Sequence, residues 1–134
     1  LPECTIGETF YFDFVPTDVE LGPDGILYVT SLPGGPEGES PLGPLGAVFK
    51  VNPSTGATTE VAAGFAGATD LAITKSGAIY VTELFGNQVS MVSGGGPVPV
   101  ASMAEPVAIE YAKGTLYVAS GVFGGPGQVV TLLP

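Results

Sequence analysis

The sequence predicts an all-β protein built from a repeated unit, and two observations carry this prediction. A stretch of two short strands joined by a glycine turn occurs three times, at 17–30, 69–82 and 106–119. Strand-like runs and Gly or Pro turns also recur about every ten residues, without the 3.6-residue periodicity of helices. Aligned without a gap, the three stretches share a turn glycine and a tyrosine three residues later: Gly25 and Tyr28, Gly77 and Tyr80, Gly114 and Tyr117.

The composition suits a single acidic domain. The chain has 134 residues, of which 45% are hydrophobic, so it can bury a sizeable core. Thirteen acidic residues stand against three lysines and give a formal net charge of -10. Such a surface repels phosphate backbones and anionic lipid, so we expect neither nucleic acid nor a membrane as partner. The acidity suits a secreted, periplasmic or high-salt setting, and net charge that serves only solubility is the alternative.

Targeting and redox signals are weak. The one cysteine, Cys4, cannot form a disulfide within the chain, and we interpret it as an incidental thiol or, alternatively, a bridge between subunits. No stretch approaches the roughly 20 apolar residues of a membrane span. The first residues also lack the basic and then apolar layout of a signal peptide.

The first repeat, 15–66, contains four predicted strands. Proline and glycine in Gly22-Pro-Asp-Gly25 favour a turn between the first two, and Pro53-Ser-Thr-Gly56 favours one between the last two. The predicted strands are 17–22, 26–31, 47–52 and 58–62. Four antiparallel strands in one unit are the content of a β-propeller blade.

The second repeat, 67–104, has the same content with shorter connections. Pro97 and Pro99 fall in its fourth strand, where a missing backbone donor is tolerated at a sheet edge. The first strand of each blade should therefore be innermost and the fourth outermost. The predicted strands are 69–74, 78–83, 88–93 and 97–101.

The third repeat, 105–134, supplies only three predicted strands, 106–111, 115–120 and 127–133. A β-rich segment at 5–14 belongs to none of the repeats by position. We expect this segment to be the strand that completes a third blade.

Three blades cannot close a ring, and an open arc would leave apolar end faces in water. Two chains joined end to end would bury both faces around a twofold axis. We therefore predict a homodimer that closes a six-bladed ring, with the strand at 5–14 donated across the interface. A fragment of a longer chain, or a monomer that hides its edges otherwise, are the alternatives.

The repeat residues carry a resemblance to a known superfamily. Gly22-Pro-Asp-Gly-Ile-Leu-Tyr-Val29, followed by Val51-Asn-Pro-Ser-Thr-Gly56, resembles the six-bladed propellers of the NHL and SMP-30/gluconolactonase-like superfamily. The unit at 15–64 and the order of the later units resemble the ScyD/ScyE-like proteins, which are associated with scytonemin gene clusters and are longer chains with a full ring. The resemblance covers nearly all of the chain and implies a six-bladed propeller.

The resemblance also implies a test for catalysis. SMP-30-like lactonases hold a divalent metal, typically calcium, in the central channel, commonly with Asn or Asp eight residues before the turn glycine. The corresponding residues here are Thr17, Thr69 and Pro106, none of which is a strong calcium ligand. The chain has no histidine, so the histidine acid–base chemistry of other members is poorly matched.

One group of carboxylates is a candidate site. Asp18 and Asp70 start the inner strands of two blades and are expected to point toward one mouth of the channel, with Glu20 and Glu105 nearby. The dimer would bring four such aspartates together, which could hold Ca²⁺. Alternatively, each aspartate accepts backbone N–H bonds from the neighbouring blade or its own turn. Carboxylates packed this closely would raise one another's pKa.

Two long connections are expected on the same face as these aspartates. One is 32–46, and the other is 121–127, in which Phe123 is a candidate ligand-binding residue together with Asp18, Asp70, Glu20 and Glu105. They would either cover a ligand at the mouth or be tolerated insertions. The sequence thus predicts a non-catalytic module that binds a small molecule or a protein at this mouth, with a metal-dependent SMP-30/lactonase-like hydrolase as the alternative.

Overall fold

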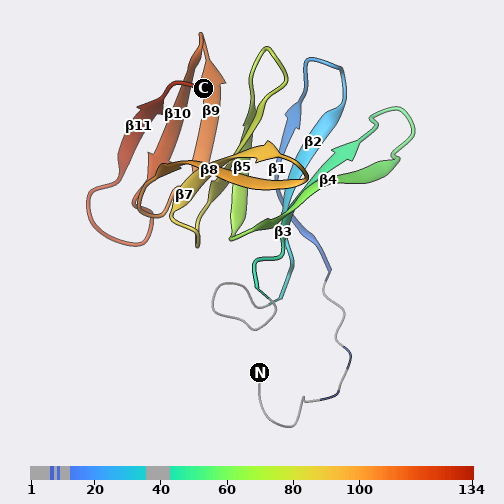
Figure 1. The fold of residues 1–134 in the computed structure, drawn as a ribbon, viewed down its shortest axis with the longest axis horizontal. Helices are drawn as coiled ribbons and strands as arrows, with labels where there is room; N and C mark the ends of the chain where they lie inside the picture. Colours follow the sequence, from blue (N-terminus) through green and yellow to red (C-terminus); the bar gives the residue numbers. More distant parts are fainter. Residues whose placement is uncertain (1–6, 8, 10–12, 36–42) are drawn as a thin grey trace.

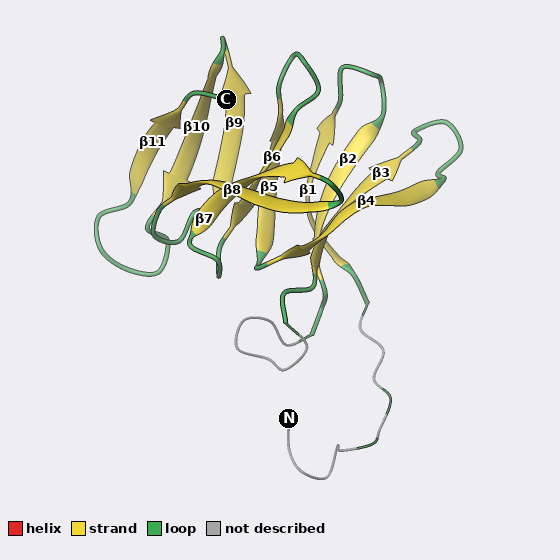
Figure 2. Cartoon of the chain, in the orientation of Figure 1, coloured by secondary structure: helices red, strands yellow, loops and turns green. Residues whose placement is uncertain are grey.

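A computed structural model describes residues 7, 9, 13–35 and 43–134, and its regular structure there consists of eleven β-strands (Figures 1 and 2). No helix long and apolar enough to cross a membrane occurs in these residues. The predicted all-β class is confirmed.

The strands form three separate antiparallel sheets in which sequence neighbours pair. The first sheet contains β1 (Val15–Leu21), β2 (Leu27–Leu32), β3 (Gly46–Val51) and β4 (Thr58–Phe65). The second contains β5 (Ala68–Ile73), β6 (Ile79–Glu83), β7 (Gln88–Ser93) and β8 (Gly96–Ser102). The third contains β9 (Ala108–Ala112), β10 (Thr115–Ser120) and β11 (Gln128–Leu132). Each strand predicted within the three repeats coincides with an observed one, and strand ends differ by at most three residues.

The sheets are arranged as blades around their first strands. β1 contacts β5, and β5 in turn contacts β9, so the first strands are neighbours along one line. Pro97 and Pro99 lie in β8, which is an edge of its sheet, as the sequence predicts. The β1–β2, β5–β6 and β9–β10 hairpins lie at one end of the blades, and the β10–β11 connection lies at the other (Figure 1).

The hydrophobic core lies between the blades, in two layers. The first layer joins the first and second sheets and the second joins the second and third, because alternate residues of each strand face opposite neighbours. The first layer is made by Tyr28, Val48, Ala62, Phe65, Ala68, Leu71, Ile79 and Val81. The second is made by Ala72, Tyr80, Val89, Ile109, Leu116 and Val118.

The three repeat tyrosines differ in burial. Tyr28 and Tyr80 are only 8% and 6% exposed, because each packs in a layer between two sheets. Tyr117 is 42% exposed, since no further sheet of the described residues covers that side of the third blade. The first two tyrosines therefore serve blade packing.

The third inner hairpin is shorter than the other two. In the second sheet Ile73 pairs with Ile79 across a five-residue turn, whereas in the third Ala112 pairs with Thr115 across only Lys113-Gly114. These two residues have φ values of 51° and 88°, as a two-residue hairpin turn requires.

The gap-free alignment of the third repeat is therefore wrong for its first strand. Asp70 lies opposite Thr82, and the residue opposite the equivalent position in β10, Ala119, is Ala108. The inner strand of the third blade thus carries alanine where the first two carry aspartate. The position equivalent to Thr69 is likewise Val107 rather than Pro106.

The segment 5–14 falls largely outside the described residues, so its pairing in a third blade stays a prediction. Phe14, which is described, precedes β1, and its ring packs edge-on against Phe49 of β3 with 5.0 Å between centroids. The connection expected at 32–46 runs between the ends of β2 and β3, and its residues 36–42 also lie outside the described part.

Candidate functional site

Asp18 and Asp70 meet at one backbone amide between neighbouring blades. The Leu71 N–H donates to Asp18 Oδ2 over 3.3 Å and to Asp70 Oδ1 over 2.9 Å. The Ile109 N–H of β9 donates to Asp70 Oδ2 over 2.7 Å. Each carboxylate therefore joins its own inner strand to the next one. The described residues thus show the second alternative, in which each aspartate accepts a backbone N–H bond from the neighbouring blade.

A β-bulge precedes each aspartate and explains its position. The strand register shifts between Pro16 and Asp18, and again between Ala68 and Asp70. The extra residue is a threonine in both cases, and bulges commonly redirect the side chain that follows. The same irregularity thus places both carboxylates beside the following blade.

The threonines in these bulges bond within the protein. The Thr17 hydroxyl donates to the carbonyl oxygen of Ala68 over 2.9 Å and lies 3.0 Å from the Thr30 hydroxyl. The Thr69 hydroxyl lies 2.9 Å from that of Thr82. Two of the three positions that the resemblance relates to calcium ligation therefore hold hydroxyls engaged in bonds between strands or blades.

Negative charge is crowded around Asp70. Burial raises the pKa of Asp70 to about 7, and a hydrogen bond with the Asp18 carboxyl adds to the rise, whereas the N–H bonds from Ile109 and Leu71 act in the opposite direction. Burial also raises the pKa of Glu20, helped by the charges of Asp18 and Glu110. Carboxylates from all three inner strands thus influence one another.

Glu110 is a member of this group that sequence reasoning missed. It lies opposite Tyr117, just as Glu20 lies opposite Tyr28, so the two glutamates occupy equivalent positions in the third and first blades. The gap-free alignment hid this equivalence. Recognising Lys113-Gly114 as a two-residue hairpin turn would have revealed it. We call Asp18, Glu20, Asp70 and Glu110 the inner-strand carboxylates.

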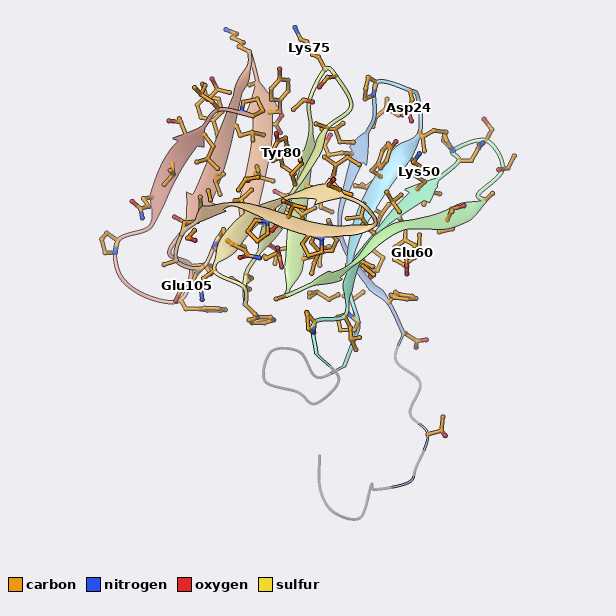
Figure 3. All side chains as sticks on the ribbon, viewed as in Figure 1. Asp24, Lys50, Glu60, Lys75, Tyr80 and Glu105 are labelled. Carbon is orange, nitrogen blue, oxygen red and sulfur yellow. The ribbon has the colours of Figure 1, made fainter. Side chains whose placement is uncertain are left out.

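Glu105 and Phe123 form a separate arrangement. Glu105 Oε2 accepts a hydrogen bond from the Phe123 N–H over 2.8 Å, and the Glu105 N–H donates to Asn87 Oδ1 over 3.0 Å. The Phe123 side chain is 68% exposed. Glu105 lies at the end of the blades opposite Lys75 and Asp24 (Figure 3). It therefore holds the β10–β11 loop in place, and no described contact joins it to Asp18 or Asp70.

Glu83 is a second carboxylate that sequence reasoning missed. It is only 1% exposed at the end of β6. Its Oε2 accepts the Ala66 N–H over 2.8 Å, and its Oε1 accepts bonds from Gln88 Nε2 and the Ser90 hydroxyl. Glu83 therefore joins the second sheet to the connection that enters it. The signal in the sequence is a charged residue that directly ends an apolar strand.

The described carboxylates fit a calcium ion poorly within one chain. Calcium takes six to eight oxygen ligands. No group of three or more His, Cys, Asp or Glu side chains suited to a metal occurs in the described ranges. Asp18 and Asp70 alone contribute two carboxylates that already accept backbone N–H bonds.

Comparisons with known proteins place the fold among β-propellers. No protein-family model and no curated protein matches the sequence. A protein assigned as a gluconolactonase has a similar structure, with a TM-score of 0.58 and 22% identity over 79% of this chain and 41% of that chain. The PQQ-bound aldose sugar dehydrogenase of Streptomyces coelicolor gives 0.60 and 17% over 79% and 42%. Virginiamycin B lyase of Staphylococcus aureus gives 0.53 and 17% over 89% and 41%.

All three similar structures are β-propeller proteins. The predicted propeller class is therefore confirmed, as is the resemblance to gluconolactonase-like propellers at the level of the fold. The chain spans about two fifths of the length of each of these proteins.

Proposed function

We propose that this chain supplies blades of a β-propeller whose channel mouth, beside Asp18 and Asp70, binds a positively charged ligand without catalysing a reaction. The observation that carries the proposal is the crowding of the inner-strand carboxylates, which adds to the effect of burial in raising the pKa of both Asp70 and Glu20. A cation that bound there would relieve the repulsion between these groups. The affinity of such a ligand would therefore come from its attraction to the inner-strand carboxylates, which the fold holds close together.

The residues around the mouth support binding over chemistry. Thr17 and Thr69 use their hydroxyls in bonds to Ala68 and Thr82. The chain contains no histidine that could serve as a general acid or base. Asp70 could exchange a proton near neutral pH, but its two oxygens already accept N–H bonds from Leu71 and Ile109.

A titration with spermidine tests the proposal. The amide NMR signals of Leu71 and Ile109 report directly on the two aspartates, because both amides donate to them. We expect saturable shifts of these signals, weaker in Glu20→Gln and unchanged in Glu60→Gln, which removes an exposed charge of β4. Sodium chloride at equal ionic strength controls for screening. Shifts that sodium chloride reproduces would count against a binding site.

Proton linkage sharpens this experiment. The pKa of Asp70 is about 7, so its carboxylate is mostly protonated at about pH 6 and mostly charged at about pH 8. Spermidine should therefore bind more tightly at the higher pH and release a proton on binding. Equal affinity at both pH values would exclude Asp70 from the site.

The second candidate function is a metal-dependent hydrolase of the SMP-30/lactonase-like class. The fold that the chain shares with a gluconolactonase supports it, and two chains in one ring would supply four aspartates. Metal analysis after dialysis against calcium, together with a hydrolysis assay on glucono-δ-lactone, separates the two functions. Stoichiometric calcium and lactone hydrolysis, both lost in Asp70→Asn, would replace the binding proposal with the hydrolase.

A further inference from the structure

We infer that a second copy of this chain covers both open faces of the arc, with the third sheet of each copy packed on the first sheet of the other. This inference does not depend on what the channel mouth binds. It rests on comparing each open face with the equivalent residues inside the chain.

The open face of the first sheet carries residues that are buried in the other blades. Val19 is 55% exposed, whereas its equivalents Leu71 and Ile109, which occupy the same register position opposite β6 and β10, are 0% and 4% exposed. An apolar groove of about 510 Å³ runs over this face. Its apolar lining includes Phe14, Val19, Val29, Phe49 and Val51.

The open face of the third sheet shows the same pattern from the other side. Val129 of β11 is 69% exposed, whereas the equivalent Val48 and Val89 are both 0% exposed. Tyr117 on the same face is 42% exposed, in contrast to the buried Tyr28 and Tyr80. Exposed apolar faces of this kind indicate a protein interface.

The chain already contains this type of interface twice, once between its first and second sheets and once between its second and third. The two open faces correspond to the two sides of that interface. Inside the chain, the face that bears the repeat tyrosine always packs against the face that bears the residue equivalent to Val19. Continuing this rule places Tyr117 and Val129 of one copy against Val19 and Val29 of the other. Two different faces on each copy give two equivalent contacts, and these close around a twofold axis.

The length of the similar structures supports two copies rather than more. In the comparison with the gluconolactonase, 79% of this chain corresponds to 41% of that protein. Two copies therefore carry the strands of about one complete propeller. A second copy would offer a matching face to each of the two open faces.

The interface between copies would lack one bond that the internal interfaces have. Asp18 and Asp70 each accept an N–H from the next inner strand, but the equivalent residue of the third blade is Ala108. Each copy also carries a net charge of -10, so the copies repel each other. Association should therefore rest on apolar contact and strengthen as salt screens the repulsion.

Sedimentation velocity and light scattering of the 134-residue chain across a dilution series test the inference. We expect the mass of two chains, with a dissociation constant that falls as salt is added. Val129→Glu and Val19→Lys should each raise this constant about tenfold or more, because each places a charge in an apolar interface. Val100→Glu, at a 48% exposed valine of the edge strand β8, is the matched control and should leave it unchanged.

Mixing the two face variants gives a test that does not depend on either one alone. A mixed dimer of Val129→Glu and Val19→Lys contains one contact with paired opposite charges and one wild-type contact. Dimers of either variant with itself contain two damaged contacts. The mixture should therefore regain the two-chain mass, and circular dichroism should give the wild-type strand spectrum for each variant.

Three results would overturn the inference. A wild-type mass of one chain at about 100 μM would mean that other residues, such as the remainder of a longer chain, cover the faces. Open-ended larger species would exclude a closed twofold ring. A two-chain mass that persists in both variants, or a mixture of well-folded variants that stays monomeric, would place the contact elsewhere.

Discussion

Asp70 is the residue at which the three inner strands meet. Its carboxylate accepts N–H bonds from Leu71 of its own strand and Ile109 of the next, while Asp18 approaches from the previous one. The N–H bonds favour the charged form of Asp70, whereas burial and Asp18 disfavour it, and the second pair of effects is larger. The protonation state of this one side chain thus affects the contacts between neighbouring blades.

The pH dependence of stability should follow from this residue. The folded pKa of Asp70 is about 7, above the ordinary aspartate value of 3.8, so the folded state binds this proton more tightly than the unfolded state. Its contribution to stability is therefore fully present below about pH 4 and is lost as pH rises through about 7. We expect the urea midpoint to fall between about pH 5 and about pH 9, and to fall less in Asp70→Asn, whose neutral amide resembles the protonated acid.

Glu60→Gln is the control for this experiment, because Glu60 is an exposed carboxylate of β4. Its midpoint should decline with pH as in the wild type. An equal decline in Asp70→Asn would contradict the assignment of the proton to Asp70.

The strands could be predicted from the sequence more completely than the register and the side-chain positions within them. All eleven strands were predictable, because Gly and Pro turns separate runs rich in β-branched residues. The bulges before Asp18 and Asp70 were not, since a one-residue register shift leaves no mark in the apolar pattern. The position of Asp18 and Asp70 near each other was expected, but the inclusion of Glu110 depended on the length of the third hairpin turn.

The hairpin at Lys113-Gly114 offers a test at this scale. Gly114 has a φ of 88°, which an alanine adopts only with strain, so Gly114→Ala should lower the free energy of unfolding by about 1–2 kcal/mol. Gly124→Ala is the matched control, because no heavy atom lies within 4 Å of an added Cβ there and its φ lies outside the left-handed range. Urea denaturation measures both. Equal effects would contradict the left-handed backbone conformation at Gly114.

Glu83 permits a second test, on the connection between the first two blades. Glu83→Gln keeps the shape of the side chain but replaces one acceptor oxygen with an amide group that faces the donors of Ala66, Gln88 and Ser90. We expect a loss of about 1–3 kcal/mol in the free energy of unfolding. Thermal and urea denaturation should agree on this loss, and a stability equal to that of the wild type would mean that Glu83 is not bonded as described.

The described residues form an arc of three sheets with an open face at each end. The class of fold could be predicted from the count of repeats, because each blade buries its apolar face only against another blade. Which residues are uncovered required the structure, since Val19 and Leu71 differ in exposure only through their place in the arc.

Ala108→Asp should tighten the association of two copies. The new carboxylate would occupy the position that Asp18 and Asp70 hold in the other blades and could accept the Val19 N–H of the second copy. We expect the dissociation constant to fall about three- to tenfold, most clearly at acid pH, where protonation limits repulsion from Asp70. Sedimentation velocity checks this, with Ala108→Ser as control. Weaker association of Ala108→Asp at every pH would argue against the proposed pairing.

The alanine at position 108 also leaves the contact between the halves of such a ring without the aspartate bond. Within each half the blades belong to one chain and share aspartate bonds, so dilution would separate the ring only between its two chains and leave each half intact. A ligand too wide to enter the central pore could then be enclosed when two chains associate. Its release would depend on protein concentration.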